Sequence, residues 1–334
     1  MSGLLINRVH LDRHAELLAR LATPEGSGGN PIQVIVVPEG ESPPPLEPEV
    51  IASIKGAFFA RDYANPANSR RLLGIARRAP NLKWMHLGNA GADDPIFHEL
   101  MDRGVALTSS AGVTSEPIAQ SAITGLLALN RGFPMWFDAQ RRHEWARDDD
   151  HLPRDLRGQT MVVLGLGGIG GHIARFARAF GIHVIGVRRR PAGIEDGVDE
   201  WASPDRLREV LPRADVLAIT VPLTAQTHHL IDAEMIGLMP RGAILINVAR
   251  GPIIVESALI DAIRSGQLGG AYLDVFEEEP LPADSEIWDL PNVIVSPHDA
   301  GRSAGNTERI AVVFAEELEG WVLGRPSSRA VTDR

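Results

Sequence analysis

The sequence contains no cysteine among its 334 residues. Without a thiol there can be no disulfide framework, no cysteine-ligated zinc or iron–sulfur site, and no cysteine nucleophile. The absence also fits a reducing compartment, and we expect a cytoplasmic protein.

A surplus of positive charge is missing as well. Lys and Arg total 33 against 43 Asp and Glu, so the formal net charge is −10. This balance argues against a nucleic-acid partner and against binding to anionic membranes. No run of about 18 apolar residues is present, so we expect no membrane-spanning helix. The apolar stretch 4–6 is followed at once by Asn7 and Arg8, which is not the core of a signal peptide.

What the chain does contain is an alternation of short apolar runs with amphipathic stretches. Strands are expected at 32–37, 56–60, 83–87, 105–108, 161–164, 182–187, 216–220, 244–247, 271–275 and 293–296. Helices are expected at 11–21, 69–78, 95–103 and 114–130, in a second stretch that follows Gly132 and Pro134 and reaches about 145, and at 169–180, 204–210, 257–265 and 307–323. Such alternation is typical of α/β folds with doubly wound, mostly parallel sheets, and the length suggests two domains.

A glycine-rich turn stands between the expected strand 161–164 and the expected helix 169–180. Residues 165–170 read Gly-Leu-Gly-Gly-Ile-Gly. Gly165 permits a tight turn, Gly167 allows the backbone to approach a pyrophosphate, and Gly170 allows close packing of helix and strand. With Gly168 and Ile169, these residues place free N–H groups at a helix N-terminus, which predicts dinucleotide binding.

Three arginines, Arg188, Arg189 and Arg190, end the next expected strand. An NAD site usually has Asp or Glu there to bind the ribose 2′-hydroxyl group. A guanidinium instead binds a 2′-phosphate through charge-assisted hydrogen bonds, which predicts a preference for NADP, with NAD possible. The alternative is a solvated basic turn.

Three further segments follow the last three strands of this region. They are 247–251, which contains an Arg, 273–280, which contains a run of Glu, and 296–301, which contains a His. Ligands of open α/β sheets bind at the carboxyl ends of the strands. An Arg, a Glu and a His converging there beside a nicotinamide suggest reduction of a 2-oxo acid, with the Arg polarising the carbonyl group and the His supplying the proton.

Together these motifs resemble the D-isomer-specific 2-hydroxyacid dehydrogenase family. The matching stretches are 165–170, 221–224, 247–251, 274–280 and 296–301, in the family's order. The resemblance implies a Rossmann dinucleotide-binding domain at 112–299, inserted in a flavodoxin-like substrate domain built from 1–111 and 300–334. It also implies a homodimer and an NADP-preferring reductase of glyoxylate, hydroxypyruvate or a related 2-oxo acid.

The same resemblance implies the roles of individual residues. Arg250 would be the substrate arginine, His298 the acid–base histidine, and Glu279 its carboxylate partner. Any one of the three consecutive carboxylates at 277–279 could instead point inward. Ala90 and Gly91, in a glycine-rich turn, would bind the substrate carboxylate through backbone N–H groups, unless that turn is an ordinary one.

The remaining expected cofactor contacts lie after the other strands. Val221 and Pro222 would line the adenine side, Asp274 would face the nicotinamide carboxamide, and Val248 and Gly301 complete the set. Asp274 could instead be a structural carboxylate at the end of a strand.

Other functions compete with this interpretation. An NAD-dependent phosphoglycerate, formate or phosphite dehydrogenase is one alternative within the enzyme class. A nucleotide-sensing binding protein, similar to the C-terminal-binding-protein corepressors, is the alternative outside it. We expect no metal site, because the adjacent His228 and His229 have no acidic or cysteine partner at a suitable spacing.

Overall fold

The computed structural model describes residues 1–60, 65–88, 91, 94–147 and 152–331. The chain forms two compact units. The terminal unit consists of Met1–Val113 with Ala304–Arg334, and the central unit is Thr114–Ser303. Within the described ranges, no helix combines the length and the apolar character needed to cross a membrane.

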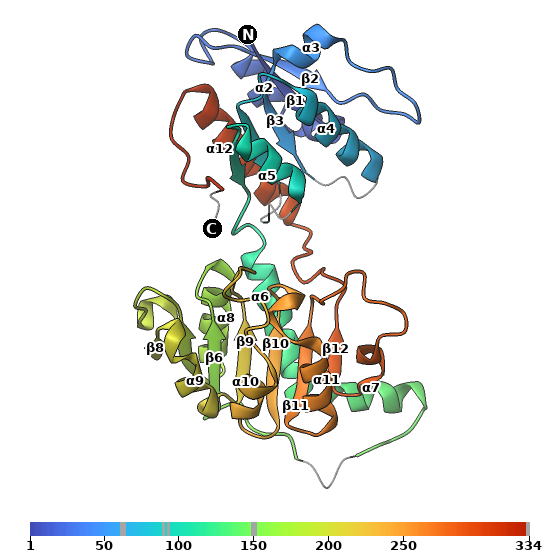
Figure 1. Ribbon diagram of the computed structural model, residues 1–334, viewed down its shortest axis with the longest axis vertical. Coiled ribbons are helices and arrows are strands. Elements are labelled where there is room, and N and C mark those ends of the chain that lie inside the picture. The colour runs from blue at the N-terminus through green and yellow to red at the C-terminus, as the bar shows by residue number, and fades with distance from the viewer. Residues whose placement is uncertain (61–64, 89–90, 92–93, 148–151, 332–334) are drawn as a thin grey trace. The chain divides into compact units, whose positions relative to one another are not determined.

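The described strands of the central unit form one parallel sheet in the order β12-β11-β10-β9-β6-β7-β8 (Figure 1). Their bounds are β6 Thr160–Leu164, β7 His183–Val187, β8 Glu200–Ala202, β9 Val216–Ile219, β10 Ala243–Asn247, β11 Leu268–Leu273 and β12 Val293–Val295. From β6 the chain proceeds to β7 and β8 on one side, and then crosses to β9 on the other. The carboxyl ends of β6 and β9 therefore flank the topological switch point, where open α/β sheets bind ligands.

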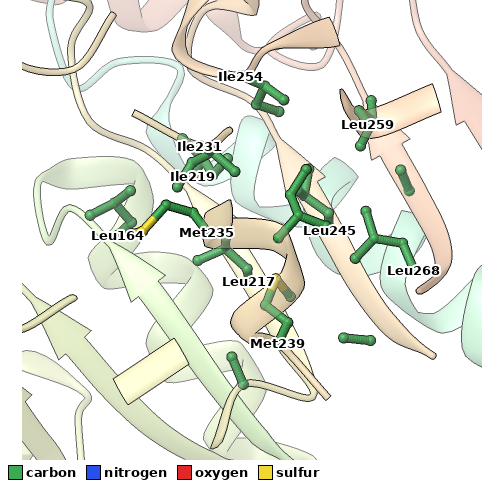
Figure 2. Close-up of a cluster of buried hydrophobic side chains, with 14 of the residues drawn as sticks. Leu164, Leu217, Ile219, Ile231, Met235, Met239, Leu245, Ile254, Leu259 and Leu268 are labelled. Atoms are coloured by element: carbon green, nitrogen blue, oxygen red, sulfur yellow. The ribbon is translucent and has the colours of Figure 1, made fainter. Parts of the chain in front are cut away.

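Helices cover both faces of this sheet because alternate strand residues point to opposite sides. On one face, Val163 and Ala218 belong to a hydrophobic cluster with side chains of α6 (Ser115–Asn130) and α8 (Gly168–Ala179). Leu164 and Leu217 belong to the other cluster, which includes Met235 (Figure 2). That second face is covered by α9 (Leu207–Val210), α10 (Ala233–Leu238) and α11 (Glu256–Arg264). Both sheet faces are thus buried, and the strand ends remain the places where ligands can bind.

Shorter elements complete the central unit. α7 (Phe133–Arg141) follows α6, and 3₁₀ helices span Ile194–Asp196, Pro204–Arg206, Leu211–Arg213, Gly251–Ile253 and Glu286–Asp289.

The described strands of the terminal unit form a second parallel sheet, in the order β2-β1-β3-β4-β5. The strands are β1 Ser2–Ile6, β2 Ile32–Val36, β3 Ile54–Phe59, β4 Trp84–Leu87 and β5 Ala106–Ser109. The helices are α1 Arg8–Arg13, α2 Ala15–Leu21, α3 Pro48–Ser53, α4 Pro66–Arg78, α5 Pro95–Asp102 and α12 Asn306–Val322. This strand order is that of flavodoxin-like sheets.

The C-terminal part of the chain completes the terminal unit. Phe314 of α12 stacks on Phe58 of β3 with ring centroids 3.9 Å apart. Beyond α12, the Val331 N–H donates to the Leu107 carbonyl oxygen at 2.8 Å, beside an antiparallel bridge between Thr108 and Ala330. The unit is therefore assembled from both ends of the sequence.

The expected fold class, two doubly wound parallel sheets in an α/β protein, is confirmed. Several elements differ from expectation. The apolar residues near the N-terminus form β1, an internal strand between β2 and β3, whose five residues are all buried and so show no alternation. The helix expected at 11–21 is two helices, α1 and α2, separated at His14. The second helical stretch, expected to reach about 145 after the helix that ends near 130, is α7 and ends at Arg141. The elements α3, α10 and β8 were not expected because each is very short.

A buried histidine joins the last two strands of the terminal unit. His86 of β4 is fully buried, with Nδ1 2.8 Å from Thr108 Oγ1 and Nε2 3.0 Å from Ser110 Oγ. Thr108 Oγ1 accepts a hydrogen bond from Trp84 Nε1 at 3.1 Å, which leaves its O–H group able to donate to Nδ1. Burial, assisted by the charge of Arg329, lowers the pKa of His86 to about 3. The imidazole is therefore neutral at physiological pH.

This burial predicts a pH-dependent stability. The imidazole of the unfolded chain takes up a proton below its pKa of 6.5, whereas that of the folded chain does not until about pH 3. The contribution of His86 to the free energy of unfolding is therefore complete above pH 6.5 and decreases as the pH falls towards 3. We expect His86→Gln to be destabilising at pH 7. That destabilisation should shrink by about 1.4 kcal/mol per pH unit below 6.5. Urea unfolding followed by tryptophan fluorescence at pH 7, 5.5 and 4.5 measures it, and a pH-independent difference between wild type and variant would contradict it.

Candidate active site

The glycine-rich turn follows β6 and begins α8. Gly165 has a φ of 98°, in the left-handed region that favours glycine. A Cβ atom on Gly170 would lie 1.9 Å from the Gly165 carbonyl oxygen, so helix and turn are too close for a side chain there. A Cβ atom on Gly167 would meet no described atom within 4 Å. The turn therefore leaves no room for a side chain at Gly170, whereas the space beside Gly167 is open.

The start of α8 fits the phosphates of a dinucleotide. Gly167 is the N-cap residue, and no side chain of the described residues caps the helix. The N–H groups of Gly168, Ile169 and Gly170 stand in the first turn of the helix, where backbone donors have no partner within the helix. With the positive end of the helix dipole, they form an anion-binding position beside open space.

The end of β9 packs against this turn. Thr220 Oγ1 donates to the Gly165 carbonyl oxygen at 2.7 Å, and a Cβ atom on Gly165 would lie 2.9 Å from Val221 Cγ1. Val221 is half-buried and Pro222 is exposed. The structure therefore places the expected phosphate and adenine contacts on the two sides of the switch point.

The two arginines expected to bind a 2′-phosphate differ in their surroundings. Arg188 forms an ion pair with Asp196, with Nη2 3.0 Å from Oδ2, and its side chain is 25% exposed. Arg189 follows Arg188 just after the end of β7 and is exposed.

Arg250 follows β10, and its loop packs against the segment after β11. A Cβ atom on Gly251 would lie 1.8 Å from the backbone carbonyl carbon of Phe276, so the two loops touch through their backbones. The Asn247 side chain accepts a hydrogen bond from the Ala249 N–H and donates one to the Arg250 carbonyl oxygen. Sequence reasoning did not single out Asn247 itself, although it fixes the loop that carries Arg250.

Glu279 and His298 meet at the same edge of the sheet. His298 Nδ1 lies 2.7 Å from Glu279 Oε2, and Glu279 Oε1 accepts a hydrogen bond from the Phe276 N–H at 3.1 Å. The two side chains are 35% and 48% exposed, for Glu279 and His298 respectively. No described residue hydrogen-bonds Nε2 of His298. The carboxylate therefore orients the ring and leaves the other nitrogen for a ligand.

The backbone of His298 is held in an uncommon conformation. Its φ is 52°, in the left-handed region, and its N–H donates to the Asp274 carbonyl oxygen at 2.8 Å. Non-glycine residues with positive φ persist where the surrounding structure determines them, and they gather at functional sites.

Asp274 supplies much of that surrounding structure. Its Oδ1 accepts hydrogen bonds from Ser296 Oγ at 2.6 Å and from the N–H groups of Asp299 and Ala300, both at 2.9 Å. Burial raises the pKa of Asp274, although these hydrogen bonds oppose the shift. Tyr272 bonds Ser296 Oγ through its hydroxyl group at 2.9 Å. No sequence pattern marks Tyr272, which simply continues the strand.

The neighbouring carboxylate Glu277 contacts other residues. Glu277 Oε1 lies 3.1 Å from His229 Nε2, and the Glu277 N–H donates to Glu256 at 3.2 Å. Across the described ranges, no group of three or more His, Asp or Glu side chains is arranged to hold a metal ion.

The other expected residues are placed as follows. Val248 is buried after β10, and Gly301 stands near Ile118 of α6. Gly91 is half-buried in an irregular segment after β4. Ala90 lies outside the described residues.

Comparisons with known proteins agree with this architecture. Residues 123–300 match the model of the D-isomer specific 2-hydroxyacid dehydrogenase NAD-binding domain. A glyoxylate reductase of Korarchaeum cryptofilum is 34% identical over 75% of this chain and 76% of its own. A glyoxylate/hydroxypyruvate reductase B of Yersinia pestis is 36% identical over 76% and 78%, respectively. A D-isomer specific 2-hydroxyacid dehydrogenase from Xanthobacter autotrophicus, solved with NADPH and MES, is 30% identical with a TM-score of 0.74, over 99% of this chain and 98% of that one.

The match covers more than half of the chain, and it includes the glycine turn at the switch point, Arg250 and the Glu279–His298 pair. The chain therefore belongs to the D-isomer specific 2-hydroxyacid dehydrogenase family.

Proposed function

We propose that the protein reduces a small 2-oxo acid to the D-2-hydroxy acid with NADPH, using His298 as the proton donor. The chain is an NAD(P)-dependent dehydrogenase by family, and its relatives include glyoxylate and hydroxypyruvate reductases. The observation that carries the proposal is the 2.7 Å contact between His298 and Glu279 at the carboxyl edge of the dinucleotide-binding sheet.

In this proposal each residue acts on a stated group. His298 Nε2 gives a proton to the carbonyl oxygen of the substrate, while Glu279 holds the ring by Nδ1. Arg250 binds the substrate and stabilises the negative charge that develops on the same oxygen. The nicotinamide, when bound, supplies the hydride. In the reverse direction the same histidine accepts the proton.

The two units would divide this work. We assign dinucleotide binding to 112–299 and the substrate domain to 1–111 with 300–334. Ala90 and Gly91 would bind the substrate carboxylate through their N–H groups. The contacts of the nucleotide would come from the first turn of α8 and from Val221, Pro222, Val248, Asp274 and Gly301.

Two features support NADPH as the preferred nucleotide. The strand that would carry a carboxylate in an NAD site carries arginines instead, and the Xanthobacter relative was solved with NADPH. The names of the relatives support glyoxylate and hydroxypyruvate as substrates.

The decisive experiment is a substrate panel read as nucleotide oxidation. The panel contains glyoxylate, hydroxypyruvate, pyruvate and phenylpyruvate, and we expect turnover of glyoxylate or hydroxypyruvate. We also expect a higher kcat/KM for NADPH than for NADH. A clear preference for NADH would contradict the assigned nucleotide. Bound nucleotide without turnover of any 2-oxo acid would contradict the activity and favour a nucleotide-sensing binding protein.

We also propose a cytoplasmic homodimer. Phe133, Trp136 and Phe137 of α7 are 39%, 42% and 49% exposed, which is unusual for clustered aromatic side chains and fits a subunit contact. Light scattering should give twice the chain mass, and Trp136→Glu should give the mass of one chain. A wild type of single-chain mass at micromolar concentration would contradict the dimer. Cell fractionation tests the location.

A further inference from the structure

The three arginines after β7 are not equivalent. Arg188 turns its guanidinium back onto its own loop: Nε donates to the Arg190 carbonyl oxygen at 2.8 Å, and Nη2 donates to the Pro191 carbonyl oxygen at 2.6 Å and to Asp196 Oδ2 at 3.0 Å. A guanidinium has five N–H donors, so more than half of them are used within the loop. Arg189 and Arg190 are exposed.

Asp196 closes the loop from its other end. Its Oδ2 also accepts the Gly193 N–H at 3.1 Å, so one carboxylate oxygen joins Gly193 to Arg188. The pair is partly buried, with side-chain exposures of 25% for Arg188 and 38% for Asp196.

The backbone of Arg188 is fixed as well. Its N–H donates to the Ala202 carbonyl oxygen at 3.2 Å, and its carbonyl oxygen accepts Trp201 Nε1 at 2.9 Å. Because both backbone groups and the guanidinium of this residue are bonded, the position of the next residue, Arg189, is determined.

We propose that Arg188 and Asp196 form a clamp that positions Arg189 to bind the 2′-phosphate of NADPH. Arg188 is in this view a positioning residue, and Arg189 is the phosphate ligand. The inference rests on the proposed preference for NADPH. It differs from the simpler expectation that both arginines bind the phosphate directly.

Charge and entropy both favour this division. Asp196 alone would repel a phosphate, and its pairing with Arg188 neutralises that charge. An arginine side chain loses conformational freedom when it binds, and a backbone already held in place reduces the further ordering that binding requires.

The two roles of Arg188 predict opposite effects of removing Asp196. If Arg188 binds the phosphate with its remaining donors, Asp196→Ala frees a guanidinium and removes a negative charge, so affinity for the phosphate rises. If the clamp positions Arg189, Asp196→Ala releases the loop, so affinity falls. Whether Asp196→Ala raises or lowers the affinity for the 2′-phosphate therefore distinguishes the two roles of Arg188.

The test is calorimetric titration with adenosine 2′,5′-bisphosphate and with 5′-AMP, which lacks the 2′-phosphate. The measured quantity is the ratio of the two Kd values, because general damage to the nucleotide site weakens both ligands alike. We expect Asp196→Ala and Arg188→Ala each to lower this preference by about three- to tenfold. The double variant should lower it no further, since either change alone opens the clamp. Arg189→Ala should lower it at least as much.

Two further variants guard against a general structural effect. Asp196→Asn keeps an oxygen acceptor for Gly193 and Arg188, so it should retain most of the preference. Arg178→Ala breaks an ion pair of comparable exposure with Asp199, where Nε lies 3.1 Å from Oδ1, and it should leave the ratio unchanged.

A stronger preference for the bisphosphate in Asp196→Ala would overturn the clamp while leaving the NADPH assignment intact. Additive losses in the double variant would overturn it as well. A wild type that binds both nucleotides equally would overturn the NADPH preference itself, and the clamp with it.

Discussion

Replacement of His298 with alanine is expected to lower kcat by about 10²–10⁴-fold, the usual contribution of a positioned general acid. Nε2 is the nitrogen that Glu279 does not occupy, and without it the developing negative charge on the substrate oxygen receives no proton from the protein. Nucleotide affinity should change little, because the glycine turn lies after β6 and His298 after β12, at distant positions in the sheet order.

The control for this variant is a second histidine with similar geometry. His229 has the same φ of 52°, and its Nε2 lies 3.1 Å from Glu277 at comparable exposure. We expect His229→Ala to keep kcat within about threefold of the wild type, as for a surface substitution away from the chemistry. Steady-state kinetics with the best 2-oxo acid of the panel measures both variants. A fall of less than about tenfold in His298→Ala, or an equal fall in both variants, would rule out the general-acid role.

The sequence predicted those features that depend on local pattern. The glycine turn lies where it was expected because only glycine fits its φ of 98° at Gly165 and the close approach at Gly170. The segments with Arg250, Glu279 and His298 follow β10, β11 and β12, which are consecutive in the sheet order. They lie at one edge because parallel strands end at the same edge of a sheet.

What the sequence could not predict depends on which partner a side chain finds in the folded chain. Among three consecutive carboxylates, only the resemblance to the family pointed to Glu279, and the local pattern did not; in the fold Glu279 contacts His298 and Glu277 contacts His229. Likewise, Arg188 and Arg189 look alike in sequence, and only the return of the chain at Asp196 separates them. β1 was missed for a related reason, because a fully buried strand has no alternation to detect.

Replacement of Arg250 with alanine is expected to lower kcat by about 10²–10³-fold, the usual effect of removing one donor to a developing oxyanion. KM should also rise by about tenfold, because the variant loses a charge-assisted hydrogen bond to the substrate. A residue that bound substrate and transition state equally would raise KM alone. Arg241 precedes β10 as Arg250 follows it, and its Nη2 donates to the Ser265 carbonyl oxygen at 2.7 Å. Arg241→Ala, at the opposite end of the same strand, should leave both constants near the wild-type values.

The Arg250→Lys variant then separates charge from geometry. Lysine keeps the positive charge but loses the planar fork that can bond two oxygens at once. If charge alone stabilises the oxyanion, this variant should recover most of kcat. We expect its kcat to stay within about tenfold of that of Arg250→Ala. The backbone around Arg250 is held by the Asn247 side chain and by the contact of Gly251 with Phe276. The loop therefore cannot shift to bring a lysine side chain into the position of the guanidinium. Near-complete recovery by lysine would show that the site needs only a point charge there.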